Sequence, residues 1–245
     1  VVKLLLEQVY EPVFSYRSHG FRQDRSCHTA LTSIKDYWTG VKWLVDVDVV
    51  SFFDNIDHDI LLGLLRKKID DERLIRLVAG MLKAGYMENW IFHATHSGTP
   101  QGGVVSPILA NIYLHELDEF LTTMKARFDR GDRRADNPRY RNLTISIYKR
   151  RLRVERLLAD GRKAEAQAVL NKIRELETER STLPSKDGLD PNFRRLLFCR
   201  YADDFLIGVI GSKADAREVM QAVTTFLRQH LRLDASPEKS KVSKE

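Results

Sequence analysis

The sequence predicts an α+β fold in which helices cover an antiparallel sheet. Segments 42–53 and 196–210 show the alternation and the β-branched and aromatic content of strands. The segments between and after them repeat apolar residues at helical spacing. The predicted order is strand, two helices, strand, helix, an inserted segment, two strands and a helix. With 245 residues, 43% of them apolar and 30% charged, the chain can bury one core and carry an appendage.

The first predicted strand is KWLVDVDVVSFF, residues 42–53, and its alternation puts Asp46 and Asp48 on one face. Apolar spacing then predicts one helix around 60–65 and a second that begins near Asp70 and ends at Gly85. NWIFHATH, residues 89–96, alternates again and predicts a strand.

A loop, GTPQGG, precedes the next predicted helix. Ser106 and Pro107 predict its start, with the Ser106 hydroxyl as the cap and the proline in the first turn. The helix is expected to run to about residue 121. Residues 125–145 are basic and are expected to form an irregular connector.

The next segment, 146–179, has a helical pattern that Asp160 and Gly161 interrupt, so we expect two helices joined as a hairpin. Leu170, Ile173 and Leu176 would bury the second helix.

A β-hairpin is predicted at 196–210, with its turn at Ala202 to Asp204. Ser212 and Asp215 form the pattern of a capping box and predict a helix that ends near His230.

The basic residues are concentrated in one part of the chain. The whole chain has a net charge of +6, but residues 120–195 contain 20 Lys and Arg against 11 Asp and Glu. Seven of the basic residues lie within 18 positions, opposed only by Glu155: Arg139, Arg141, Lys149, Arg150, Arg151, Arg153 and Arg156. Because a solvated helix face usually mixes its charges, this concentration favours a nucleic-acid contact over an ordinary surface helix.

Other classes of protein are disfavoured. No stretch approaches the roughly 18 to 20 apolar residues of a membrane span, and the N-terminus lacks the pattern of a signal peptide. Cys27 and Cys199 have no metal-binding or disulfide spacing, so both are expected to be core residues. His58, His93 and His96 are not spaced as a ligand set.

Asp203 and Asp204 interrupt an apolar hairpin. Two adjacent like charges are costly there, although a turn at the sheet edge lowers the cost. A simple polar turn is one interpretation, since Asp is common in turns. The other is a divalent cation between the carboxylates, with Asp48 as a third ligand and two ions arranged for phosphoryl transfer.

Three sequence motifs, in the order given below, resemble the palm of reverse transcriptases, and their residues are similar to those of the group II intron-encoded family. They are DVDVVSFFDNIDHDIL (46–61), GTPQGGVVSPILANIYL (98–114) and YADD (201–204). The resemblance extends from SYRSHGFRQDRS (15–26) to SPEKSKV (236–242). It implies the fingers and palm of a right-handed polymerase, with a basic α-helical hairpin inserted.

The resemblance also implies roles for individual residues. Asp48, Asp203 and Asp204 would be catalytic and hold two Mg²⁺ ions. Phe53 would be a steric gate that excludes a 2′-hydroxyl, although at least one of Phe52 and Phe53 must be core because they alternate. Further nucleotide-binding residues would be Gln101, Gly102 and Lys239, where Lys239 is preferred to Lys241 as the proton donor to pyrophosphate. A solvated surface lysine is an equal interpretation.

Arg22 and Arg25, in a segment that departs from the family pattern at His19, Gln23 and Asp24, would contact template or primer phosphate or serve a structural role. In the insertion, the RNA contacts would be made by Arg139, Arg141, Lys149, Arg150, Arg151 and Arg153.

The implied function is that of an RNA-directed DNA polymerase that is also a maturase, a protein that assists intron splicing and mobility. Its partners would be intron RNA, an RNA template with a DNA primer, and dNTPs. Two alternatives remain. One is an RNA-binding maturase scaffold with little polymerase activity, and the other is a related reverse transcriptase of a defence or diversity-generating system.

The expected organisation is part of the fingers at 1–41, palm and fingers helices at 42–119, the insertion at 120–195 and the rest of the palm at 196–245. Thumb and endonuclease segments are not recognisable, so a fingers–palm fragment is expected. The bacterial cytoplasm is the expected location and an organelle the alternative. A homodimer through an exposed helix stays open.

Overall fold

The computed structural model describes residues 1–245 except positions 85, 89–90, 94–97, 100–102, 189 and 245. It divides into two compact units, which we name the sheet unit (Val1–Asp129 with Arg194–Glu245) and the hairpin unit (Arg130–Phe193). The hairpin unit lies within the insertion expected over 120–195, whereas residues 120–129 group with the sheet unit.

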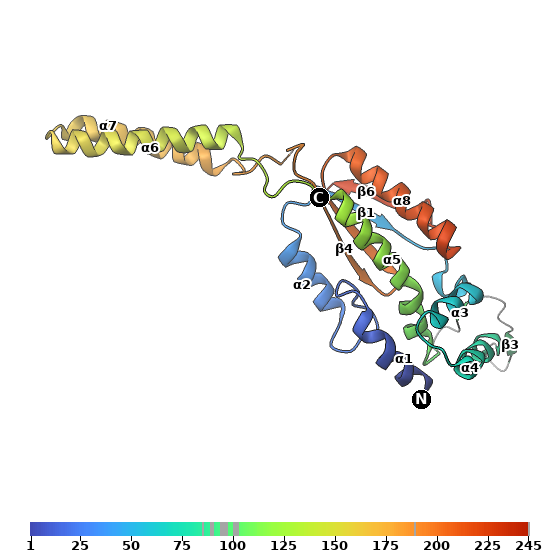
Figure 1. Cartoon of the computed structure of the whole chain (residues 1–245). Coiled ribbons are helices and arrows are strands. Elements are labelled where there is room, and N and C mark those ends of the chain that lie inside the picture. Colours follow the sequence, from blue (N-terminus) through green and yellow to red (C-terminus); the bar gives the residue numbers. More distant parts are fainter. Residues whose placement is uncertain (85, 89–90, 94–97, 100–102, 189, 245) are drawn as a thin grey trace. The chain divides into compact units, whose positions relative to one another are not determined.

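The sheet unit is built on a four-stranded antiparallel sheet in the order β4-β5-β1-β6 (Figure 1). The strands are β1 (Trp43–Val47), β4 (Arg195–Tyr201), β5 (Asp204–Ile210) and β6 (Lys241–Lys244). Val45 lies opposite Ile207 and Val47 opposite Phe205, and all four side chains are buried. Alternation along β1 therefore directs its valines into the core and leaves Asp46 half-buried on the other face.

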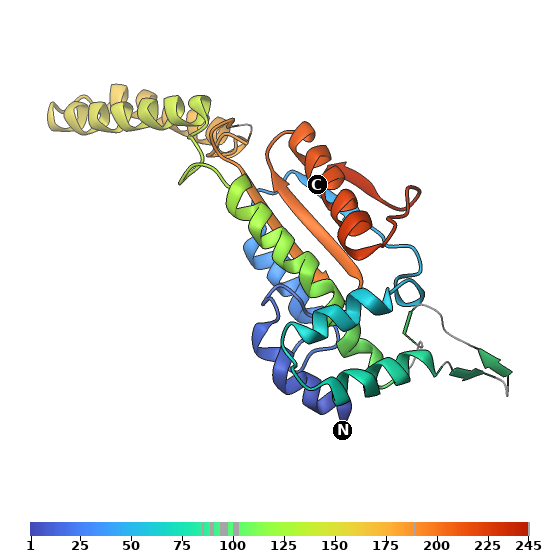
Figure 2. The ribbon, with the colours of Figure 1, turned by 45° about the vertical axis from the view of Figure 1, so that its right-hand side comes forward.

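Two long helices, α5 (Ser106–Phe128) and α8 (Lys213–Leu231), pack along the sheet (Figure 2). In α8, apolar residues at intervals of three to four bury one face, and the Ser212–Asp215 capping box predicted from the sequence is confirmed. Phe120 of α5 stacks on Phe226 of α8 with ring centroids 4.2 Å apart. These two helices close one side of the core.

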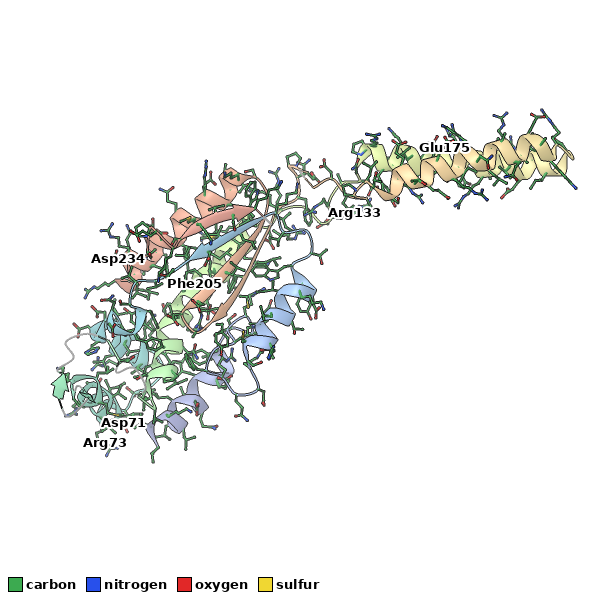
Figure 3. All side chains as sticks on the ribbon, turned by 180° about the vertical axis from the view of Figure 1, so that it is seen from behind. Asp71, Arg73, Arg133, Glu175, Phe205 and Asp234 are labelled. Carbon is green, nitrogen blue, oxygen red and sulfur yellow. The ribbon has the colours of Figure 1, made fainter. Side chains whose placement is uncertain are left out.

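Shorter elements complete the sheet unit. They are α1 (Val2–Tyr10), a 3₁₀ turn (Glu11–Val13), α2 (Cys27–Tyr37), α3 (His58–Arg66), α4 (Glu72–Lys83) and the two-stranded β2 (Tyr86–Glu88) and β3 (Ile91–His93). Asp57 caps α3 and Asp71 caps α4, where Asp71 also pairs with Arg73 (Figure 3). The two helices predicted around 60–65 and after Asp70 are thus confirmed.

The hairpin unit consists of α6 (Pro138–Ala159) and α7 (Lys163–Ser181). Its small core contains Ile147, Val154, Leu157, Ala166 and Ile173, with Leu170 and Leu176 partly buried against it. Gly161 turns the chain with a φ of +74°, in the left-handed region that glycine tolerates best. The predicted helical hairpin, including its break at Asp160 and Gly161, is therefore confirmed.

Three predictions of local secondary structure are wrong, and Cys27, which was expected to be a core residue, is exposed, whereas Cys199 is buried as expected. The first strand ends at Val47 rather than near residue 53, because Ser51 adopts a left-handed conformation (φ 42°) and a 3₁₀ turn follows at Phe52–Asp54. Ser106 is the first residue of α5 rather than its cap, since Val105 occupies the cap position without a side-chain hydrogen bond.

The third concerns residues 125–145, which are not an irregular connector throughout: α5 continues to Phe128, and Asn137 caps α6, which begins at Pro138. Among the described residues, no helix is both long and apolar enough to cross a membrane.

Candidate active site

The β4–β5 hairpin ends in a tight turn that presents two carboxylates. Tyr201 pairs with Asp204, and Ala202 and Asp203 form the turn between them. Ala202 has a φ of +56°, which is uncommon for a residue with a Cβ atom. Ala202 is buried, Asp203 is half-buried and Asp204 is exposed. The hairpin and the position of its turn are thus as the sequence predicts.

Strand register brings Asp48 to the same place. Asp46 lies opposite Leu206 and Val47 opposite Phe205, so the register continued by one residue puts Asp48 beside Asp204. Directly opposed residues in an antiparallel pair have Cα atoms roughly 4.5–5.5 Å apart. We name this group, Asp48 with Asp203 and Asp204, the carboxylate edge.

The chain around Asp48 is fixed by the segment that precedes β6. The Ser236 amide donates to the Asp48 carbonyl oxygen (2.7 Å), and the Asp48 amide donates to Ser240 Oγ (3.2 Å). Nζ of Lys239 lies 3.4 Å from Asp48 Oδ2. Lys239 was predicted from the sequence, whereas the serines on either side of it, which hold Asp48, were not.

The carboxylates repel one another. Reduced hydration raises the pKa of Asp204 above its ordinary value, and repulsion from Asp203, Asp48 and Asp46 raises it further. Within the described part of the chain, no three His, Cys, Asp or Glu side chains stand close enough to hold a metal ion as they are. The carboxylate edge is therefore a concentration of negative charge rather than a closed coordination shell.

Phe53 lines a pocket of about 600 Å³ on the sheet unit, together with Lys3, Phe21, Gly103, Val104, Ser106 and Pro107. Phe52, by contrast, is buried in the core and meets Phe53 edge to face at 5.2 Å. One phenylalanine is thus core and its neighbour lines a pocket. The cause is a 3₁₀ turn rather than the strand alternation expected from the sequence.

The predicted nucleotide-binding residues Gln101 and Gly102 lie outside the described residues. The two positions before that loop dock on the Phe53 turn: the Thr99 amide donates to the Phe53 carbonyl (2.7 Å), and the Gly98 amide donates to that of Ile56 (2.8 Å). Gly98 has a φ of +85°, and a Cβ atom there would lie 2.5 Å from the Phe53 carbonyl oxygen. This position therefore requires glycine.

The side chain of Arg22 is hydrogen-bonded to other groups of the protein. Its guanidinium donates to Glu11 and to the carbonyls of Ser15 and Ser18, with a side chain only 6% exposed. This arrangement favours the structural role over a phosphate contact. Arg25 is half-buried and donates to the Tyr16 carbonyl at 3.2 Å.

The basic residues of α6 differ in their surroundings. Arg139 pairs with Glu179 and Arg151 with Glu177, both on α7. Arg150 is half-buried and donates to Ser146. Exposed basic side chains without a hydrogen bond or ion pair among the described residues remain at Arg141, Lys149, Arg153 and Arg156. These four are better placed for a polyanion than the paired ones.

Another feature of α6 was missed. Ile145, Tyr148 and Leu152, spaced three and four apart, form an exposed apolar stripe in which Tyr148 is 62% exposed. Positions 141, 149 and 156 fall along the same face by helical spacing, so Arg141, Lys149 and Arg156 flank this stripe. The signal in the sequence was this second set of apolar residues, whose helical spacing places it on a different face of α6 from the buried apolar residues.

A buried polar network beneath the carboxylate edge was also missed: Gly20, Asn111, Asp118 and Arg200. The signal available was Arg200 itself, a charged residue within an otherwise apolar strand, directly before the Tyr-Ala-Asp-Asp turn.

Comparison with known proteins agrees with these observations. Residues 1–148 match the family described as reverse transcriptase (RNA-dependent DNA polymerase). The chain is 43% identical over 242 residues to the group II intron-encoded protein LtrA of Lactococcus lactis subsp. cremoris, an alignment that covers 99% of this chain and 39% of that protein. A 91 kDa protein in the cob intron of Schizosaccharomyces pombe is 38% identical over 99% of this chain and 28% of its own length.

The putative COX1/OXI3 intron 2 protein of Saccharomyces cerevisiae is 36% identical over 98% of this chain and 26% of its own length. The chain thus spans about two fifths or less of these relatives, which come from bacterial and fungal introns. The resemblance first drawn from three short motifs therefore extends along the described sheet unit and hairpin unit alike. The chain belongs to the reverse transcriptase family, and these three relatives, which match almost its whole length, are described as intron proteins.

Proposed function

We propose that the chain is an RNA-dependent DNA polymerase that adds deoxynucleotides to a primer on an RNA template. The observation that carries the proposal is the carboxylate edge, where Asp48 lies beside the Asp203–Asp204 turn by strand register although more than 150 residues separate them in sequence. Family membership supports the same reaction.

The donors of the carboxylate edge fit Mg²⁺, which prefers carboxylate oxygens. Mutual repulsion raises the pKa of Asp204, and a bound cation would relieve it. Asp48, Asp203 and Asp204 would hold two ions. When bound, these ions would lower the pKa of the primer hydroxyl and stabilise the negative charge on the leaving pyrophosphate.

The remaining residues would bind and orient the nucleotide. Phe53, which lines the 600 Å³ pocket, would press on C2′ of the incoming sugar. Gln101 and Gly102 would contact the nucleotide from the loop that Gly98 and Thr99 anchor. Lys239, whose Nζ pairs with Asp48, would be the proton donor to the departing pyrophosphate.

The assignment of DNA rather than RNA synthesis is tested by primer extension on an RNA template, with dNTPs and rNTPs offered separately. Phe53→Leu should raise rNTP incorporation relative to dNTP incorporation. Phe21→Leu is the matched control, because Phe21 lines the same pocket and leucine avoids a β-branched side chain at its φ of 56°. Efficient rNTP incorporation by the unaltered chain would contradict the proposal.

We further propose that the hairpin unit binds structured RNA, which corresponds to the maturase part of the predicted function. The hairpin unit contains 16 Lys and Arg against 10 Asp and Glu, whereas the sheet unit contains 24 of each. All of the net positive charge therefore belongs to the hairpin unit. Within it, α6 has seven basic residues and one acidic residue, whereas α7 has four of each.

Phosphate neutralisation provides most of the affinity of such a helix, while exposed aromatic side chains can stack on unpaired bases. The stripe of Ile145, Tyr148 and Leu152 between Arg141, Lys149 and Arg156 combines both properties on one face of α6. The intron-encoded relatives favour intron RNA as the ligand.

A further inference from the structure

The Tyr-Ala-Asp-Asp turn is supported by a fully buried ion pair. The side chain of Arg200, the residue before Tyr201, is 1% exposed, and that of Asp118 on α5 is 0% exposed. Nε of Arg200 donates to Asp118 Oδ1 at 3.0 Å, and Nη2 donates to Oδ2 at 2.7 Å. The pair is therefore bidentate, the geometry that fixes a guanidinium most rigidly.

The remaining guanidinium nitrogen points to the turn. Nη1 of Arg200 donates to the carbonyl oxygen of Ala202 at 2.8 Å and to Asn111 Oδ1 at 3.0 Å. Nδ2 of Asn111 in turn donates to the carbonyl of Gly20 at 2.8 Å. The network thus joins α5, β4, the turn and the segment around Gly20.

Gly20 closes the network on its other side. A Cβ atom at this position would lie 2.1 Å from the Ala202 amide nitrogen, so the backbone of Gly20 packs directly against the turn. The His19 amide also donates to the Arg200 carbonyl at 2.8 Å. The left-handed conformation of Ala202 is consequently held from both sides, as expected where a sparsely populated conformation is maintained.

The bond to Ala202 has a direct consequence for the carboxylates. The carbonyl of Ala202 and the amide of Asp203 belong to one planar peptide group. A hydrogen-bond donor that fixes the direction of the Ala202 carbonyl therefore also fixes the orientation of the Asp203 amide in the same peptide plane. Compared with apolar residues in the same place, a buried ion pair adds little to the free energy of unfolding. A gain in stability therefore does not explain why Nη1 of Arg200 bonds to the turn.

We propose that Arg200, oriented by Asp118 and Asn111, is a positioning residue that sets the Ala202–Asp203 peptide and thereby aims Asp203 and Asp204 at their divalent cations. The inference rests on the proposed polymerase function, because it assigns the network to the same metal site. It predicts that Arg200 acts on metal binding without touching metal or substrate.

The principal test replaces the pair by Arg200→Met with Asp118→Leu, which removes both buried charges together with the donor to Ala202 and Asn111. We expect a Tm within about 4 °C of the unaltered chain, because such replacements are often neutral or stabilising. Mn²⁺ affinity, measured by electron paramagnetic resonance, should fall by about tenfold, as for other residues that orient ligands. The kcat of nucleotide addition should fall with it, while the KM for dNTP stays unchanged.

Arg200→Lys is the second variant, because it keeps the charge but cannot bond to Asp118 through two nitrogens and to Ala202 at once. It should show the same loss of Mn²⁺ affinity, and it decides the question if the double variant does not fold. Arg194→Met is the matched control, since Arg194 pairs with Asp215 near the other end of β4. Its Mn²⁺ affinity should be unchanged.

Wild-type Mn²⁺ affinity in a folded Arg200→Lys or double variant would overturn the inference, and so would the absence of any Mn²⁺ site in the unaltered chain. Failure of the proposed polymerase function would give a different result from failure of the inference about Arg200. In that case the unaltered chain binds Mn²⁺ but adds no nucleotide, and the comparison of Mn²⁺ affinities still tests Arg200.

Discussion

The ammonium of Lys239 lies 3.4 Å from Oδ2 of Asp48, so a cation of the protein itself occupies the carboxylate edge. The Lys239 side chain is 71% exposed and that of Asp48 31% exposed, which limits the strength of the pair. Since Ser236 and Ser240 hold the backbone of Asp48, the same short segment positions the carboxylate and supplies its countercharge. If Asp48 holds a metal ion as proposed, Lys239 and the ion would compete for the same carboxylate.

Replacement of this lysine tests that competition. Lys239→Met should raise Mn²⁺ affinity by about two- to fivefold, because an exposed pair is worth less than roughly 1 kcal/mol, and it should lower the rate of nucleotide addition. Electron paramagnetic resonance and single-nucleotide addition measure the two effects. Lys68→Met is the control for loss of an exposed positive charge elsewhere. If Lys239→Met weakens Mn²⁺ binding, the interpretation is wrong.

The repulsion at Asp204 predicts a pH-dependent stability. Because the pKa of Asp204 is raised in the folded state, the fold binds its proton more tightly than the unfolded chain does, and stability is lost as the pH rises from the ordinary value of 3.8 through the folded value. Asp204→Asn should therefore raise Tm at pH 7 by about 1–2 °C, and the gain should shrink toward pH 4.

Thermal unfolding without divalent ions, at several pH values, measures this difference. Mg²⁺ should then stabilise the unaltered chain more than Asp204→Asn, because the variant lacks one of the proposed ligands. A lower Tm for Asp204→Asn at pH 7 in the absence of metal would contradict the account.

Gly20 and Gly63 should respond to alanine in opposite directions. At Gly20 the new methyl would meet the backbone of Ala202 at 2.1 Å, so the turn must move; we expect a loss of about 1–3 kcal/mol, as for other overpacked sites. Gly63 lies within α3 with nothing within 4 Å of the added atom, so a gain of about 0.5–1 kcal/mol is expected. Urea unfolding measures both, and equal stabilities of the two variants would count against the contact at Gly20.

The face of α6 can be tested by charge reversal. Arg141, Lys149 and Arg156 changed together to Glu should weaken binding to an RNA hairpin and lower the salt slope by about three, one for each phosphate contact. The control reverses Lys163, Lys172 and Arg174 on α7, which changes the charge equally. If both triple variants lose the same affinity, α6 is not the RNA-binding face.

Tyr148→Ala adds a test of base stacking. Affinity for an RNA hairpin with an unpaired loop should fall by about tenfold, because stacking contributes roughly 1–3 kcal/mol per base. Affinity for a fully paired RNA should change little. A fluorescence anisotropy titration with both RNAs measures the difference, and an equal loss for the two would exclude stacking by Tyr148.

Local patterns in the sequence predicted much of the fold. The capping box at Ser212 and the break at Gly161 depend on residues within a few positions of one another, so they could be identified without tertiary contacts. Ser106 departs from its local pattern, because the chain enters the helix one residue earlier than the hydroxyl suggested. Strand β6 was not predicted, because its four residues form a strand only through pairing with β1.

In the candidate site, too, the features that depend on local sequence were predicted and those that depend on tertiary contacts were not. The carboxylates stand in recognisable motifs, and their order along the chain was enough to group them. The partners of Arg200 come from α5 and from the segment around Gly20, about 80 or more positions away, and no periodicity in the sequence links them. Arg22 was expected to be equally suited to phosphate or to a structural role, and only the location of Glu11 and the carbonyls of Ser15 and Ser18 separates these roles.

The most direct measurement of the central claim is single-nucleotide addition to a DNA primer on an RNA template with Mg²⁺, with primer–template binding measured in the same samples. The unaltered chain should add one dNTP, whereas Asp48→Asn, Asp203→Asn and Asp204→Asn should each lower the rate by at least about a hundredfold. Asp54→Asn, an exposed carboxylate near the site, should keep the activity. A chain that binds the primer–template but adds no nucleotide, or aspartate variants that add it at the same rate, would contradict the account.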